Sequence, residues 1–316
     1  MLMTWQWFVV GLLVLELIAC LVIGSMSGFR YSIPLDSYLI VSAVFAVVFT
    51  YIVAITQLLF LKKQMPWRWV LETCGAFAMV AIQMALLSWT KNMMPHVTGF
   101  WADEVLADLD FWLFGADPWI WLHENLSRIS AILDRAYISW APIKFLTLLL
   151  LILMPQNLSR SRLLCTYFIT VSLGAFGQYA LPSAGPIFFE RIGMGERYSA
   201  MPIAPWAEAA ASYLWHDFTH GNGKIGTGIS AMPSMHVATA AWIGLVVRKQ
   251  LPSLQIFGWA YFFLICVGSV YLGWHYAIDA IGGVLAVTIA WYLAGQVTKF
   301  RRESFNQTPA GNIRLG

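Results

Sequence analysis

Charged side chains are scarce in this sequence. Asp, Glu, Lys and Arg make up 11% of the 316 residues, whereas hydrophobic residues make up 59%. Because soluble domains carry about 25% charged residues, this composition disfavours a water-soluble protein. It favours an all-α protein that crosses a membrane several times. The formal net charge of +3 is small and gives no indication of a nucleic-acid partner.

Cysteine is also rare, with four residues in the chain, and no two of them lie close together in the sequence. Cys20, Cys74, Cys165 and Cys266 each fall inside an apolar run. A disulfide framework or a cysteine-based zinc site needs closely spaced cysteines. We therefore expect buried, unreactive thiols.

Long apolar runs dominate the rest of the chain. A helix that spans a bilayer needs about 20 mostly apolar residues. Candidate spans cover residues 5–26, 38–61, 67–89, 136–155, 163–182, 234–248, 254–275 and 278–298. The predicted fold is therefore a polytopic membrane bundle of about eight transmembrane helices.

Basic residues follow every second predicted span, at Lys62, Lys63 and Arg68, at Arg160 and Arg162, at Arg248 and Lys249, and at Lys299, Arg301 and Arg302. The positive-inside rule places such junctions in the cytoplasm. We expect a multi-pass protein of the plasma (inner) membrane with both termini cytoplasmic. The loop before His236 and the turn with His275 then share the outer, periplasmic side.

The segment 91–135, also on the outer side, mixes acidic with aromatic residues. Gly115 and Pro118 interrupt it, which favours separate amphipathic helices at the membrane interface. The sequence leaves open whether this segment holds a lipid tail over a site or is only a structural brace.

The stretch Gly228–His236 reads GISAMPSMH and directly precedes an apolar run. It places Ser234 and His236 at the expected start of a helix, where Pro233 suits the first turn. The unpaired N–H groups and the dipole of a helix start attract phosphate. Ser234 has two compatible roles there, as a helix cap and as a hydrogen-bond donor to phosphate.

A second stretch places His275 and Asp279 four positions apart, so a helix would bring them to one face. A carboxylate in that place fixes the tautomer of the imidazole and raises its basicity. Titratable groups at membrane depth are costly and usually functional. Two histidines and an orienting acid therefore predict a nucleophile and a general acid.

Pro-Ser-x-His followed by Ser-x5-His-x3-Asp resembles the type-2 phosphatidic acid phosphatase superfamily, the membrane lipid phosphatases related to vanadium haloperoxidases. The resemblance runs from Gly226 to Asp279 and is closest to the inositol phosphorylceramide synthase-like branch. It implies that His275 attacks phosphorus and forms a phosphohistidine, and that Asp279 orients His275. It also implies that His236 protonates the leaving oxygen and then activates the acceptor, without a metal or other cofactor.

The sequence departs from this family where the phosphate is held. Val270 stands at the position of a family arginine, and the chain lacks the Arg-Pro dipeptide that ends the family's first motif. Phosphoryl transfer needs cations on the equatorial oxygens. We expect Lys224, Arg191 and Arg197 of the outer loop to bind phosphate. Lys224 is best placed, because the glycines around it let the backbone approach a ligand closely.

Two further pairs of polar residues stay open. His216 and His220 have a spacing that suits a metal on a helix, but the sequence offers no clear third ligand, so we expect no metal site. Glu72 and Lys144 lie in or near apolar runs. They either pair within the bundle or contact a lipid headgroup.

These observations favour a lipid phosphate phosphatase that acts on the outer face, with the lipid bilayer and a membrane lipid as its partners. The first alternative is a headgroup phosphotransferase of the inositol phosphorylceramide synthase type, because the outer loop 183–232 is long and aromatic enough to exclude water. The second is a non-enzymatic transporter, which needs charged or broken helices near the midplane; here the titratable groups concentrate at one face.

The predicted organisation has four parts: N-terminal transmembrane helices (1–90), the outer amphipathic segment (91–135), a phosphatase-like catalytic transmembrane core (136–298) and a polar cytoplasmic tail (299–316). The sequence gives no oligomeric state.

Overall fold

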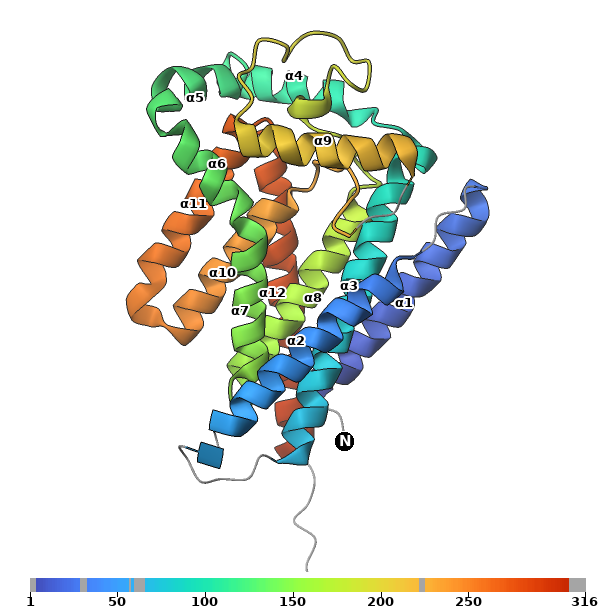
Figure 1. Cartoon of the computed structure of the whole chain (residues 1–316), viewed down its shortest axis with the longest axis vertical. Helices are drawn as coiled ribbons and strands as arrows, with labels where there is room; N and C mark the ends of the chain where they lie inside the picture. Colours follow the sequence, from blue (N-terminus) through green and yellow to red (C-terminus); the bar gives the residue numbers. More distant parts are fainter. Residues whose placement is uncertain (1–3, 29–32, 57, 60–65, 222–224, 307–316) are drawn as a thin grey trace, which may run out of the picture.

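The computed structural model describes residues 4–28, 33–56, 58–59, 66–221 and 225–306 (Figure 1). This part of the chain contains no strand, and the predicted all-α class is confirmed. Its α-helices are α1 (Thr4–Ser27), α2 (Leu35–Thr56), α3 (Trp67–Thr98), α4 (Ala102–Phe114), α5 (Pro118–Leu126), α6 (Ser130–Ile138), α7 (Trp140–Leu153), α8 (Leu158–Gly177), α9 (Pro205–His220), α10 (Met235–Gln250), α11 (Gln255–Tyr271) and α12 (Asp279–Asn306). Short 3-10 turns are η2 (Ser127–Ile129), η3 (Pro186–Phe188) and η4 (Pro252–Leu254).

Five helices of the described chain are long and apolar enough to cross a membrane, namely α1, α2, α3, α11 and α12. A sixth span results if the bent pair formed by Pro118–Ile138 and α7 counts as one. The predicted number of eight is therefore not confirmed. The two predicted spans that fall short, α8 and α10, bury most of their side chains against other helices. A helix enclosed in this way can carry polar residues, because few of its side chains face lipid.

The long helices run alongside one another, and α4 and α9 lie across one end of the bundle (Figure 1). The segment 91–135 is interrupted where the sequence predicts. Helix α4 ends at Phe114, Gly115 follows in a left-handed conformation with a φ of +75°, and α5 begins at Pro118. Helices α10 and α12 both begin near the end of the bundle that α4 and α9 cover.

Glycine brings the starts of α10 and α12 together. A Cβ atom at Gly283, in the second turn of α12, would lie 2.5 Å from the carbonyl oxygen of Ser234 and 3.1 Å from the amide nitrogen of Ala238. Small residues allow such backbone contact between membrane helices. The contact joins the helix that starts with Asp279 to the one that carries His236.

Candidate active site

His236 lies in the first turn of α10. The helix begins here because Ser234 caps it: the Ser234 hydroxyl accepts a hydrogen bond from the amide of Val237 at 3.3 Å. The His236 ring stacks on Tyr137 at a centroid distance of 4.7 Å and lies tilted against Trp140 at 4.1 Å. The cap and the two aromatic rings fix the imidazole at the helix start.

His275 lies in the turn between α11 and α12, and not on a helix as its spacing from Asp279 suggests. Gly273 makes this turn possible with a φ of +72°. The expected contact forms nevertheless, with His275 Nδ1 at 3.3 Å from Oδ2 of Asp279, the first residue of α12. The same oxygen accepts a hydrogen bond from the amide of Tyr276 at 3.0 Å. Asp279 therefore holds both the helix start and the imidazole.

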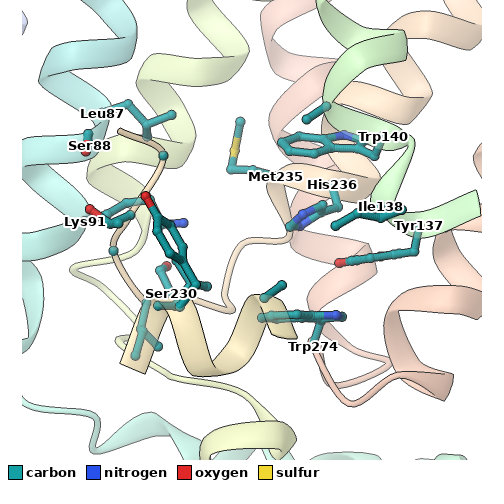
Figure 2. Close-up of a pocket in the computed structure, with 18 of the residues that line it drawn as sticks. Leu87, Ser88, Lys91, Tyr137, Ile138, Trp140, Ser230, Met235, His236 and Trp274 are labelled. Carbon is teal, nitrogen blue, oxygen red and sulfur yellow. The ribbon is translucent and has the colours of Figure 1, made fainter. Parts of the chain in front are cut away.

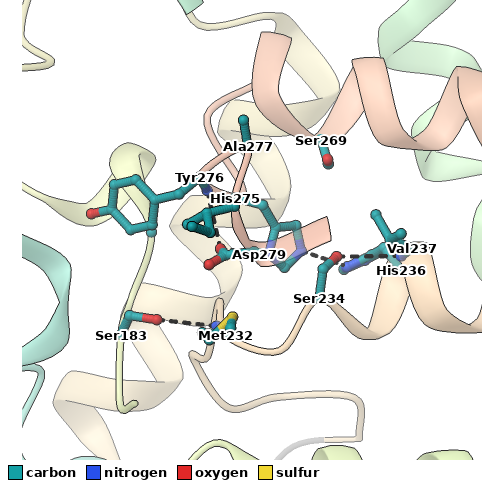
Figure 3. A network of polar contacts seen from close by, with 12 residues as sticks. Ser183, Met232, Ser234, His236, Val237, Ser269, His275, Tyr276, Ala277 and Asp279 are labelled. Atoms are coloured by element: carbon teal, nitrogen blue, oxygen red, sulfur yellow. Dashed lines mark hydrogen bonds and ion pairs between the residues drawn. The ribbon is translucent and has the colours of Figure 1, made fainter. Parts of the chain in front are cut away.

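His236 and His275 meet side by side (Figure 3). Nδ1 of His236 lies 3.1 Å from Nε2 of His275. Because the Asp279 carboxylate requires a donor at Nδ1 of His275, Nε2 of His275 carries the lone pair and accepts from Nδ1–H of His236. The three side chains form one hydrogen-bonded chain.

Two carboxylates of α4 hold the backbone around this chain. Asp110 accepts from the amides of Ala277 and Ile278 at 2.6 and 3.0 Å, inside the turn that links His275 to Asp279. Asp103 accepts from the Tyr276 hydroxyl at 2.7 Å. Asp103 also accepts from the amides of residues 184 and 185, at 2.7 and 2.8 Å.

Burial raises the pKa of both Asp103 and Asp110 to about 6, while the bonds from these donors act in the opposite direction. Both carboxyl groups are therefore charged at neutral pH. The acidic character of this segment is visible in the sequence, but this role is not. The available signal is a pair of acidic residues seven positions apart, hence on one face of the α4 helix.

A cavity of about 360 Å³ opens next to His236 and His275. Its lining is mostly apolar and aromatic, and it includes the lysines Lys91 and Lys144. Figure 2 shows Lys91 and His236 on opposite walls of this space, with Trp140 and Tyr137 against the imidazole. Side chains of α9, among them Trp206 and Tyr213, also line it.

Comparison with protein families decides the affiliation. A family model described as the PAP2 superfamily matches residues 106–293, more than half of the chain. The chain belongs to the PAP2 superfamily. The resemblance drawn from the sequence is thus confirmed at the level of the superfamily, whereas the inositol phosphorylceramide synthase-like branch stays a prediction. Membership indicates a phosphatase or a phosphotransferase. Neither the curated proteins nor the solved structures gave a match to the chain.

The arginines predicted to replace the PAP2 phosphate clamp are engaged elsewhere. Arg191 pairs with Glu208 at 3.1 Å. Arg197 pairs with Asp117 and Asp108, both at 2.7 Å, and these bonds raise the pKa of its guanidinium. Neither arginine is among the described residues that line the cavity. Lys224 lies outside the described residues, and its role stays a prediction.

An ion pair between Glu72 and Lys144, one of the two arrangements that the sequence leaves open, does not form in the described part of the chain. Gln156 donates a hydrogen bond to Glu72, whereas Lys144 reaches the PAP2 cavity. Of the two possibilities that the sequence leaves open, an ion pair within the bundle is thereby excluded. Lys91 carries no distinguishing signal in the sequence, because it is one charge near the end of a long apolar run.

His216 and His220 stack at a centroid distance of 4.3 Å on α9. In the described part of the chain, no group of three His, Cys, Asp or Glu side chains is arranged to hold a metal ion.

Proposed function

We propose that this protein is a membrane lipid phosphate phosphatase that works through a phosphohistidine at His275. The observation that carries the proposal is the chain of contacts from Asp279 through His275 to His236, which opens on a cavity large enough for a phosphate group. In this proposal residues 136–298 form the catalytic core, and the site faces the outer side of the membrane.

In the first step, Nε2 of His275 attacks phosphorus while the bond between phosphorus and the lipid oxygen breaks. His236 enters this step as the imidazolium; it gives a proton to the leaving oxygen, which departs as an alcohol, and becomes neutral. Asp279 stabilises the positive charge that develops on the His275 ring, because its carboxylate holds Nδ1–H. The contact between the two imidazoles opens when substrate enters, since the attacking lone pair accepts the His236 proton at rest.

In the second step, water attacks the phosphorus of the phosphohistidine. His236, now neutral, takes a proton from that water, the bond between nitrogen and phosphorus breaks, and phosphate leaves. Covalent catalysis divides one difficult displacement into two easier ones. The start of α10 supports both steps: the amides of Met235 and His236 have no hydrogen-bond partner among the described residues, and such groups attract a phosphate oxygen.

The second candidate is a phosphotransferase, in which a lipid alcohol replaces water. The observation that favours it is the position of α9, whose side chains Trp206, Tyr213 and Leu214 line the cavity and restrict access of water. The two candidates share the first step and differ only in the acceptor of the second.

The experiment is to incubate purified protein with lipid phosphate labelled at phosphorus, with and without saturating inositol lipid or ceramide. Free labelled phosphate as the main product, lost in His275→Ala, supports the phosphatase. A labelled acceptor with little free phosphate establishes the transferase instead. EDTA is expected to leave the rate unchanged. Loss of activity in EDTA that zinc restores would instead indicate a metal site at His216 and His220.

A further inference from the structure

Two lysines from helices distant in sequence line the cavity with His236. Lys91 comes from α3, and Lys144 comes from α7 with only 6% of its surface exposed. Neither ammonium has an ion-pair or hydrogen-bond partner in the described part of the chain. An unpaired buried charge is costly, and proteins retain one where a ligand of opposite charge binds. The pair thus marks an anion site.

Trp140 connects Lys144 to His236. The Lys144 ammonium lies 4.2 Å from the centroid of the Trp140 ring, and the His236 ring lies 4.1 Å from it. The indole is fixed by a hydrogen bond from its Nε1 to the Thr239 hydroxyl at 2.7 Å. Contact with an aromatic face offsets only part of the desolvation of an ammonium. Lys144 is therefore held against the same indole as the imidazole, with its charge largely uncompensated.

The glycine-rich loop before α10 holds Lys91. A Cβ atom at Gly228 would lie 2.5 Å from Cβ of Lys91, and Gly228 has a φ of +102°. Asn92 adds a hydrogen bond from its Nδ2 to the Thr227 hydroxyl at 3.3 Å. The glycine thus lets the loop pack directly on the base of Lys91, whose ammonium points into the cavity opposite His236 (Figure 2).

The remaining charged group of the lining does not neutralise the lysines. Asp134 is the carboxylate among the described lining residues, and it accepts from the amides of Trp206 and Ala207 at 2.9 and 3.0 Å, at the start of α9. The two lysines and His236 therefore line the same cavity, and no carboxylate of the described residues forms an ion pair with any of the three.

We infer that Lys91 and Lys144 together bind the phosphate of the substrate, and that they supply the charge of the missing family arginines. The inference rests on the proposed function for the identity of the reaction. Two ammonium groups match a phosphate monoester, which carries a charge of about −1.5 to −2 at neutral pH. The substrate class is therefore a lipid phosphomonoester and not a diester. Lys91 lies outside the residues 106–293 that match the family, so α3 contributes to the site from beyond the family core.

The test uses full-length protein in detergent micelles, dioctanoyl phosphatidic acid as substrate and orthovanadate as phosphate probe. Lys91→Met and Lys144→Met should each raise KM and the vanadate inhibition constant by about tenfold or more, because each removes a charge-assisted hydrogen bond to the anion. Lys91→Arg and Lys144→Arg should recover most of the affinity, since they keep the charge. Lys249→Met, at an exposed lysine on the last turn of α10, is the matched control with unchanged constants.

Vanadate binding to wild-type protein and to His275→Ala separates this site from the chemistry. If wild-type protein hydrolyses the lipid and the methionine variants keep its KM and vanadate affinity, the lysine site is wrong and the proposed function stands. If wild-type protein hydrolyses nothing but binds vanadate with an affinity that depends on both lysines, the site stands and the proposed function fails. If a methionine variant does not fold, judged by its size-exclusion profile, the arginine variants decide. If both arginine variants bind vanadate no better than unfolded protein does, the proposal that the two lysines bind phosphate is wrong.

Discussion

Nδ1 of His236 lies 3.1 Å from Nε2 of His275, although 39 positions separate the two residues in the chain. The first histidine comes from the start of α10 and the second from the turn before α12. Because Asp279 holds the opposite nitrogen of His275, the pair has a direction: a proton on His236 faces a lone pair on His275. This arrangement underlies the following predictions.

Substitution of any one of the three hydrogen-bonded side chains His236, His275 and Asp279 should abolish most of the activity. We expect His236→Ala, His275→Ala and Asp279→Asn each to lower kcat by about a hundredfold or more, the usual scale for acid–base groups. Lipid phosphate hydrolysis measured on purified protein checks this. Near-normal activity of His275→Ala would contradict the covalent mechanism.

Asp110 should act as a positioning residue, because its carboxylate holds the backbone between His275 and Asp279. We expect Asp110→Ala to lower kcat by about tenfold or more with little change in KM, since a small misplacement of a reacting group is costly. Glu104→Ala, at an exposed position on the same helix, is the control. Equal effects of the two substitutions would show that α4 is only a brace.

The stability of the protein should respond to pH through Asp103. Its pKa is about 6 in the folded protein, above the value of about 3.9 for a solvated aspartate. The folded state therefore holds more protons than the unfolded chain between about pH 4 and 6, and the free energy of unfolding falls as pH rises through that window. We expect thermal unfolding in detergent to show this fall, and to show less of it in Asp103→Asn. An identical pH dependence in both proteins would exclude Asp103 as a source.

Gly283 should be sensitive to the smallest added side chain. The Cβ atom of Gly283→Ala would meet the backbone of Ser234 and Ala238, which cannot rotate away. We expect a loss of about 1–3 kcal/mol in stability together with reduced activity, because α12 must move away from α10. Gly11→Ala is the matched control within a membrane helix, since its Cβ meets nothing within 4 Å. A Gly283→Ala protein with the thermal midpoint and activity of Gly11→Ala would refute the close approach.

Sidedness can be measured with single cysteines in a background without the four natural ones. Glu190→Cys and Ser199→Cys, both at exposed positions in the loop before α9, should react with an impermeant thiol reagent on intact cells. Pro155→Cys, exposed between α7 and α8, should react only after the membrane is opened. The reverse labelling would place the chemistry in the cytoplasm.

Local patterns in the sequence determined the helical class and the identity of the motif residues. Apolar runs long enough to cross a bilayer indicate where helices form, because a helix satisfies its backbone hydrogen bonds within a single segment in lipid. The PAP2 motifs were equally readable, since Ser234 caps a helix and Asp279 reaches His275 within a few residues. The predicted count of eight spans is not confirmed, because α8 carries two arginines near its start and α10 has only 16 residues.

Only the tertiary structure decided which charges surround the site. Arg191 and Arg197 share the outer loop with Lys224, and their pairing with Glu208, Asp108 and Asp117 depends on how that loop packs. In the sequence, Lys91 and Lys144 are single charged residues within apolar helices. A charge at such a position is unfavourable unless a partner of opposite charge or a polar ligand stabilises it. Which partner it meets depends on contacts between helices remote in sequence, and packing brings these two ammonium groups to the same cavity as His236.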